Sequence, residues 1–207
     1  MDIIGDSTLT TLQTPASISA DGSTAGIDAR SLTGQGAIIM TALKTAGTNP
    51  TLAVKLQGTA DADVVTSVTP GSNTGTGTQV YGGPDAVAET ITVTLTNATT
   101  ATVVGGTSGS LANATVGTLY QSAQVEFLLT AGGTAFANND TFAIITTART
   151  YADVDGGAFT GLTTAASIQK KAIDFDKAPR YLRITYDIGG TDSPAYTVAI
   201  AAQSLTN

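Results

Sequence analysis

The chain has 207 residues, no Cys, His or Trp, and a formal net charge of −7 at pH 7. Its length suits one large β domain or two small ones, with enough residues to bury a core. The missing residue types exclude His-based triads, thiolate metal sites and disulfides, and the acidic balance argues against duplex nucleic acid or an anionic membrane as the main partner.

The composition favours β-strands over helices. Thr accounts for 39 residues, and charged residues make up only 12% of the chain. β-branched side chains lose rotamer freedom in a helix but pack well on a pleated sheet. The 23 Gly residues can supply the turns that many short strands require. We therefore expect an all-β fold.

Alternation of apolar and polar residues predicts the strands in chain order. Residues 36–44 (GAIIMTALK) are apolar on both faces and suit a central strand or a short buried helix, and the flanking Gly residues favour the strand. Clear alternation follows in residues 51–57, 89–99, 124–130, 141–147, 180–188 and 195–202. The residues expected to point inward are Leu52, Val54, Leu56, Ile91, Val93, Leu95, Val125, Phe127, Leu129, Phe142, Ile144, Leu182, Ile184, Tyr186, Tyr196, Val198 and Ile200.

Short strands joined by Gly-rich turns are typical of a β-sandwich or a jelly-roll-like barrel. The runs at 124–130 and 141–147 flank the loop AGGTAFANND and are expected to form a hairpin. Between Lys55 and Arg149 there is no basic residue, although six acidic residues lie there. We expect a β-sandwich base domain of residues 1–67 and 148–207, and a second, inserted acidic β domain of residues 68–147.

The expected junctions are rich in turn-forming residues. Residues 68–84 (VTPGSNTGTGTQVYGGP) are expected to form a loop, and residues 146–157 end in an Asp/Gly turn. The GTGTQVYGG segment looks like a phosphate-binding loop but lacks its Lys and the required strand-to-helix context, so a flexible junction is favoured.

Carboxylate pairs are the remaining source of catalytic or metal-binding chemistry. Three Asp-x-Asp sequences are present: Asp61/Asp63, Asp153/Asp155 and Asp174/Asp176. Asp at such places most often bonds the local backbone, while calcium binding and glycoside hydrolysis are the alternatives. We favour the turn role, and we expect no catalytic, cofactor or metal site and no enzymatic activity.

The stretch DFDKAPRYLRITYD, residues 174–187, differs from the rest of the chain in its charged and aromatic residues. One interpretation is a strand whose outward charges form local ion pairs with neighbouring Asp residues. The other is a face that docks on an acidic protein, because Arg and Tyr are favoured contact residues. The candidate contact residues are Lys177, Arg180, Tyr181 and Arg183.

Residues 157–200 resemble the C-terminal part of small virion-associated proteins of tailed phages. In those proteins a TLAVKLQ-like strand, here residues 51–57, leads to a GAFTGLTTA turn, here at 157–165. An ID-D---RYLR strand pair and a GGT-SPA-TV hairpin follow, here within residues 173–183 and 189–198. The short link that the family has after the Leu-Gln strand is here about ninety residues long and coincides with the interval without Lys or Arg.

Residues 114–144 (ATVGTLYQSAQVEFLLTAGGTAFANNDTFAI) resemble a β module of phage head-decoration and tail proteins. The shared features are a GT-F turn, a V-F-LTAGGTAF strand and turn, and a GDTF-I strand. Asn139 stands where the module has Gly, so a different turn type is expected there.

The two resemblances imply a non-enzymatic virion structural protein of the capsid decoration, or cement, type. Its implied partners are the major capsid protein and its own copies, in a homotrimer or similar homo-oligomer, with no nucleic acid, membrane or cofactor. It would be made in the host cytoplasm, since MDIIGDSTLT lacks signal-peptide features, and would end on the capsid surface. A phage tail or neck-fibre component and a cell-surface adhesion or carbohydrate-binding module are the alternatives.

Overall fold

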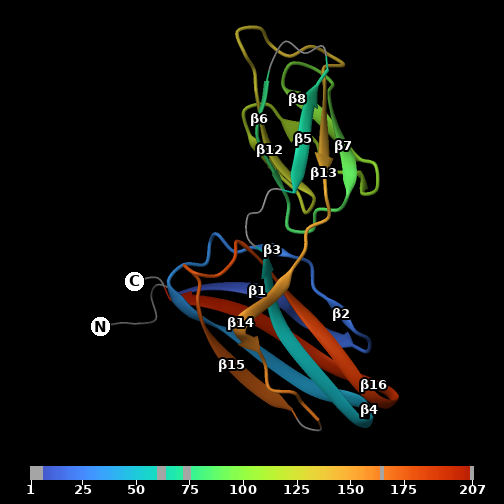
Figure 1. The fold of residues 1–207 in the computed structure, drawn as a ribbon, viewed down its shortest axis with the longest axis vertical. Helices are drawn as coiled ribbons and strands as arrows, with labels where there is room; N and C mark the ends of the chain where they lie inside the picture. Colours follow the sequence, from blue (N-terminus) through green and yellow to red (C-terminus); the bar gives the residue numbers. More distant parts are fainter. Residues whose placement is uncertain (1–6, 60–63, 72–75, 164–165, 206–207) are drawn as a thin grey trace. The chain divides into compact units, whose positions relative to one another are not determined.

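The structure is a computed structural model that describes residues 7–59, 64–71, 76–163 and 166–205 (Figure 1). The fold of these residues is all-β, as the composition predicts, because every regular element in them is a strand. The described residues contain no helix that could cross a membrane. The first six residues and the Asp61/Asp63 pair lie outside the described ranges.

The chain divides into two compact units. Unit 1 consists of Met1–Asp61 and Tyr151–Asn207, and unit 2 consists of Ala62–Thr150. Each unit has its own cluster of buried apolar residues. Residues 65–67, which the sequence analysis placed in the base domain, begin a strand that pairs inside unit 2.

Unit 1 is built on two strands of 25 residues each that pair along most of their length. These are β4 and β16, and their antiparallel register runs from Tyr181↔Thr59 to Ser204↔Gly36. The strands of unit 1 are β1 (Ser7–Ile18), β2 (Gly22–Ser23), β3 (Ile27–Asp28), β4 (Gln35–Thr59), β14 (Ala152–Ala158), β15 (Ser167–Asp174) and β16 (Tyr181–Leu205).

Both long strands bend in the middle, so that one sheet supplies two layers. Figure 1 shows β4 and β16 running to a common corner and turning back. The φ angles of Gly47 and Gly190 at this corner are 95° and 120°, which L side chains rarely adopt. Register shifts in the β4–β16 ladder occur at the same place.

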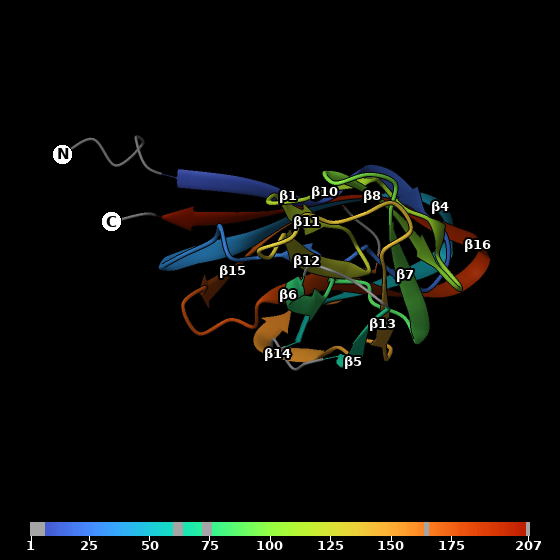
Figure 2. The same ribbon diagram turned by 90° about the horizontal axis from the view of Figure 1, so that it is seen from above.

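The partners of β4 and β16 change at the corner. Layer A contains β1, residues 195–205 of β16, residues 35–46 of β4, and β15. Layer B contains β2, β3, residues 181–191 of β16, residues 48–59 of β4, and β14. Figure 2 shows β1 beside the C-terminal part of β16. The inward side chains of the two layers form one core cluster, so unit 1 is a β-sandwich.

The strand at residues 36–44 is confirmed, because it is the first part of β4. The inward positions predicted from alternation are also confirmed. All seventeen of those residues are buried. Tyr196 has no exposed surface, and its hydroxyl donates a hydrogen bond to the Pro50 carbonyl at 2.9 Å.

Unit 2 contains two sheets around the second core cluster. The larger has the order β10-β8-β7-β13-β5, with β9 paired to β8, and the smaller has the order β11-β12-β6. The strands are β5 (Val65–Pro70), β6 (Thr76–Gly82), β7 (Glu89–Leu95), β8 (Thr100–Gly105), β9 (Gly109–Ser110), β10 (Ala114–Thr115), β11 (Leu119–Gln121), β12 (Val125–Thr130) and β13 (Thr141–Thr146).

Two expectations for unit 2 are wrong. The runs at 124–130 and 141–147 do not form a hairpin, because β12 pairs with β6 and β11 while β13 pairs with β5 and β7. The intervening loop therefore crosses from one sheet to the other. Residues 68–84 are not a plain loop, because they contain the end of β5 and all of β6. Their Thr and Val residues suit a strand despite the surrounding Gly.

Candidate functional site

The charged stretch at 174–187 begins with a turn between β15 and β16. Asp176 accepts a hydrogen bond from the Gly34 amide at 2.8 Å, and Asp174 accepts one from the Asp176 amide at 3.2 Å. Lys177 forms an ion pair with Asp174 at 2.8 Å. Phe175 is buried, and its ring lies so close to Gly36 that a Cβ there would be 2.5 Å from it. The Asp174/Asp176 pair therefore stabilises a turn.

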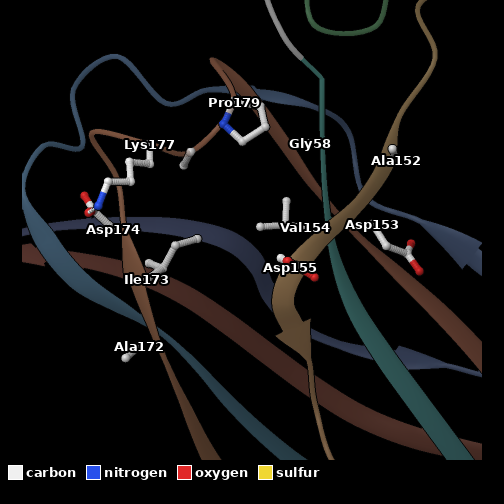
Figure 3. Close-up of a pocket in the computed structure, with 11 residues that line it drawn as sticks. Gly58, Ala152, Asp153, Val154, Asp155, Ala172, Ile173, Asp174, Lys177 and Pro179 are labelled. Atoms are coloured by element: carbon white, nitrogen blue, oxygen red, sulfur yellow. Dashed lines mark ion pairs between the residues drawn. The ribbon is translucent and has the colours of Figure 1, made fainter.

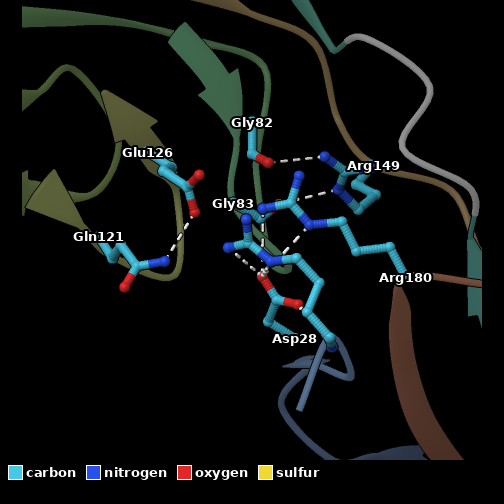
Figure 4. Close-up of polar contacts among 8 residues, drawn as sticks. Asp28, Gly82, Gly83, Gln121, Glu126, Arg149 and Arg180 are labelled. Carbon is cyan, nitrogen blue, oxygen red and sulfur yellow. Dashed lines mark hydrogen bonds and ion pairs between the residues drawn. The ribbon is translucent and has the colours of Figure 1, made fainter. Parts of the chain in front are cut away.

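Arg180 is held inside unit 1 by a carboxylate. Its Nη2 lies 3.1 Å from the Asp28 Oδ2, which also receives the Arg30 Nη2 at 2.7 Å (Figure 4). The Arg180 side chain is only 9% exposed. Burial disfavours ionisation of Asp28, but the hydrogen bonds from Arg30 and Arg180 outweigh it and lower the Asp28 pKa.

Arg183 lies on the outward side of layer B. Its Nε and Nη2 donate to the Gln57 Oε1 at 3.0 and 2.9 Å, and its guanidinium stacks over the Tyr151 ring at 4.2 Å from the centroid. This cation–π contact, which the sequence did not indicate, holds Arg183 against the sheet.

The structure does not bring the four candidate contact residues together on one exposed surface. Tyr181 is 1% exposed, and Arg180 is engaged by Asp28. The Lys177 side chain is 84% exposed, whereas Arg183 is half-buried. The stretch fits the local ion-pair interpretation, and a partner contact remains a prediction for the accessible Lys177 and Arg183.

A groove of about 420 Å³ lies in unit 1 where the open edges of the two layers meet (Figure 3). Ile173 of β15 and Val154 of β14 project into it from opposite sides. Its lining residues are Gly58, Ala152, Asp153, Val154, Asp155, Ala172, Ile173, Asp174, Lys177, Ala178 and Pro179. Two of the Asp-x-Asp sequences thus contribute carboxylates to one groove.

Two of the three groove carboxylates, Asp153 and Asp174, form ion pairs with lysines. Asp153 pairs with Lys55 at 2.7 Å and also accepts a hydrogen bond from Gln57 at 2.9 Å. The hydrogen bond from Lys55 lowers the pKa of Asp153, and the one from Lys177 lowers that of Asp174. A general acid needs a raised pKa, so neither carboxylate suits that role. Among the described residues, no group of three or more acidic side chains could hold a metal ion.

The acidic residues of unit 2 are largely buried, which the sequence did not indicate. Glu89, Glu126 and Asp140 are each at most 9% exposed. Glu89 accepts hydrogen bonds from the Thr107 and Ser108 amides at 2.8 and 2.9 Å and from the Ser108 hydroxyl at 2.6 Å. Burial opposes ionisation of Glu89, but these donors outweigh it and lower its pKa. Three of the four acidic residues that the structure describes in unit 2 are therefore buried.

Two further polar contacts in unit 2 hold its loops. Glu126 accepts a hydrogen bond from the Gln121 side chain at 2.7 Å, and Arg149 donates to the Gly83 and Gly82 carbonyls at 2.8 and 2.7 Å (Figure 4).

Asn139 adopts a φ of 71°, in the region that Gly favours, so the backbone there keeps a conformation that Gly could also adopt.

The comparisons with known proteins give no family. No family model matches the chain, and no curated protein matches it. Two crystal structures of Xanthomonas campestris FlgL, in space groups H3 and C2, align over 48% of this chain with 22% and 23% identity and a TM-score of 0.34. The alignments span about a third of the FlgL chain, 33% and 32%. At this TM-score the likeness carries no argument about fold or function.

Proposed function

We propose that this protein is a non-enzymatic virion structural protein that binds the assembled capsid of a tailed phage as a decoration, or cement, protein. Unit 1 is the base that contacts the major capsid protein, and unit 2 is an inserted β module. Binding only to the assembled shell would stabilise that shell by mass action.

The observation that carries this proposal is the pairing between two segments that the phage resemblance assigns to one module. Residues 51–57 and 181–188 are separated by more than a hundred residues, yet they pair one to one in layer B, from Arg183↔Gln57 to Ile188↔Leu52. The second resemblance, at 114–144, falls entirely within unit 2. Each resemblance thus corresponds to one unit with its own core.

The chemistry of the groove supports a binding role more than a catalytic one. Its carboxylates at Asp153 and Asp174 are neutralised by lysines, and its lining includes the apolar Val154, Ile173 and Pro179. The edge strands β14 and β15 border it, and edge strands can accept an extended segment of a partner.

Co-sedimentation with phage particles tests the proposal. Purified protein should bind expanded, DNA-filled heads in a high copy number set by the capsid symmetry. Binding in a few copies at one vertex would support the tail or neck-fibre alternative. Binding to no particle component, together with binding to a glycan array, would support the adhesion alternative and refute the decoration role.

A charge-reversal series asks which part of unit 1 docks. Lys177→Glu and Arg183→Glu change accessible charges, whereas Arg180→Glu would place a carboxylate against Asp28 and disturb the fold. Reduced capsid occupancy in a folded Lys177→Glu or Arg183→Glu variant would assign that residue to the contact. Unchanged occupancy in both would exclude these two residues from it.

A further inference from the structure

The outward face of layer A is nearly free of charge. It consists of the odd-numbered residues 37–43 and 197–203, the even-numbered residues 168–172, and Leu9 and Thr11, which the strand registers place side by side. We call this surface the apolar face. Its one charged residue is Lys170, and Asp174 borders it at the end of the same side of β15. Among the described residues of unit 1, the exposed large hydrophobic side chains are Leu9, Leu43 and Ile168, and all three lie on this face, at 66%, 51% and 77% exposure.

The outward face of layer B is different in kind. Its charged residues are Lys55, Asp153, Arg183 and Asp187. The exposed apolar residue among them is the small Ala53. The same sandwich therefore has one charged face and one apolar face. Large apolar side chains are costly to leave in water, and their grouping on one face indicates an interaction surface.

The apolar face contains both a hollow and a protruding side chain. The hollow measures about 220 Å³ and is lined by Ile39, Thr41, Ala199 and Ala201 with neighbouring β1 residues. Ile168 protrudes beside it, because Ile168 pairs with Thr41, which in turn pairs with Ala199. Two strand spacings separate Ile168 from Ala199, which is about 10 Å.

We propose that the apolar face binds the same face of a second copy of this chain around a two-fold axis. A two-fold interface requires a patch that is complementary to itself. An axis close to Thr41, midway between Ile168 and Ala199, places Ile168 of each copy over the hollow of the other. This inference does not depend on capsid binding and holds for any role of the chain.

Charge and area both favour a second copy as the occupant. The chain carries −7, but the carboxylate that borders the apolar face, Asp174 at the end of β15, is paired with Lys177, so two copies can meet there without burying an unpaired carboxylate. Lys170 is on the edge strand β15, where its amine can stay in solvent. Thirteen side chains, spaced about 4.8 Å between strands and about 6.8 Å along them, give about 420 Å² per copy, or about 850 Å² in total, which is the size of a weak, reversible interface.

Sedimentation equilibrium from about 1 to about 500 µM tests this proposal, since this range covers the weak association expected of a small interface. We expect a monomer–dimer equilibrium for the wild type and at least about tenfold weaker association for Ile168→Glu. Val104→Glu is the matched control, because Val104 is an exposed apolar residue of unit 2, at 43%. Circular dichroism and Tm verify that each variant is folded.

A cysteine variant locates the two-fold axis. The chain has no Cys, so a single introduced thiol has one partner, the same thiol of a second copy. Thr41→Cys should form a disulfide-linked dimer on mild oxidation, because the axis passes near this residue. Ala53→Cys, on the outward face of layer B, is the control and should not form a disulfide-linked dimer under the same oxidation.

Two outcomes would overturn the inference. The first is a wild type that stays monomeric at the highest concentration, and the second is a dimer that Ile168→Glu leaves intact. If a monomeric wild type also loses particle binding in Ile168→Glu, a particle protein is the occupant of the apolar face. A dimer that Ile168→Glu weakens but Thr41→Cys does not link would refute the placement of the axis.

Discussion

Gly47 and Pro194 pack against each other where β4 and β16 bend: a Cβ on Gly47 would lie 2.6 Å from the Cα of Pro194. The contact is reciprocal, since a Cβ on Gly190 would lie 2.8 Å from the Cα of Pro50. The Thr48 hydroxyl also donates to the Asp192 carboxylate at 2.5 Å across the same corner. The two strands can bend together here because a Gly of each strand packs against a Pro of the other, and a Cβ at either Gly would clash.

Gly47→Ala should therefore destabilise unit 1 by about 3 kcal/mol, through a clash with backbone atoms and a φ unsuited to Ala. This corresponds to a fall in Tm of about 10 °C. Gly156→Ala is the control, because Gly156 has a φ of 71° but nothing within 4 Å of its Cβ position. It should cost about 1 kcal/mol, from backbone strain alone. Equal losses in the two variants would mean that the contact with Pro194 is unimportant.

Asp28→Asn should lower the free energy of unfolding by about 2 kcal/mol, because it leaves the nearly buried Arg180 without its carboxylate. Lys177→Ala, which removes a highly exposed ion pair, should leave the free energy of unfolding nearly unchanged. The folded-state pKa of Asp28 is lowered, so its contribution is present above about pH 4 and is lost as pH falls through the lower folded value. Urea unfolding at neutral and acidic pH measures both effects.

Glu89→Gln should loosen the turn at residues 106–108, because the carboxylate accepts three hydrogen bonds there. We expect a loss of about 2 kcal/mol and faster amide exchange at Thr107 and Ser108. The folded pKa of Glu89 is also lowered, so the wild type should lose this contribution as pH falls below about 4, whereas Glu89→Gln should not. Ser108→Ala keeps the carboxylate and should retain the pH dependence. Identical acid profiles for the wild type and Glu89→Gln would contradict this account.

Unit 1 should fold without unit 2. Gly58 and Ala152 pair in layer B, so an Asn-Gly turn can replace residues 60–150 between the two strands. The shortened chain keeps the whole unit 1 core cluster and should unfold in one cooperative transition, measured by calorimetry. A chain with no thermal transition would show that unit 1 depends on the insertion.

The alternation of side chains could be predicted from the sequence, but the pairing of strands could not. Alternation depends on the period of a strand, so positions such as Ile91 and Val93 follow directly from residue order. Pairing depends on contacts between distant segments, which is why the expected hairpin at 124–147 is wrong. The runs at 36–44 and 51–57 are two halves of one bent strand, joined through Gly47 and Asn49, whose positive φ angles alternation does not predict.

The candidate site shows the same limit. A basic stretch is visible in the sequence, but the carboxylate that holds Arg180 is 152 residues away at Asp28. The sequence indicates the apolar face only weakly, through residues 36–44, which are apolar on both sides of the strand. That pattern fits a strand with a core on one side and the apolar face on the other.

The pairing of β4 with β16 also sets the order in which the chain can fold during synthesis. β16 begins 122 residues after β4 ends, so at about 5–20 residues per second a ribosome needs roughly 6–24 s to supply the partner of β4. All strands of unit 2 are made within that interval. Unit 2 can therefore form its core before β16 is available to pair with β4. During this interval the unpaired edge of β4 is exposed, and the nascent chain is most prone to aggregation.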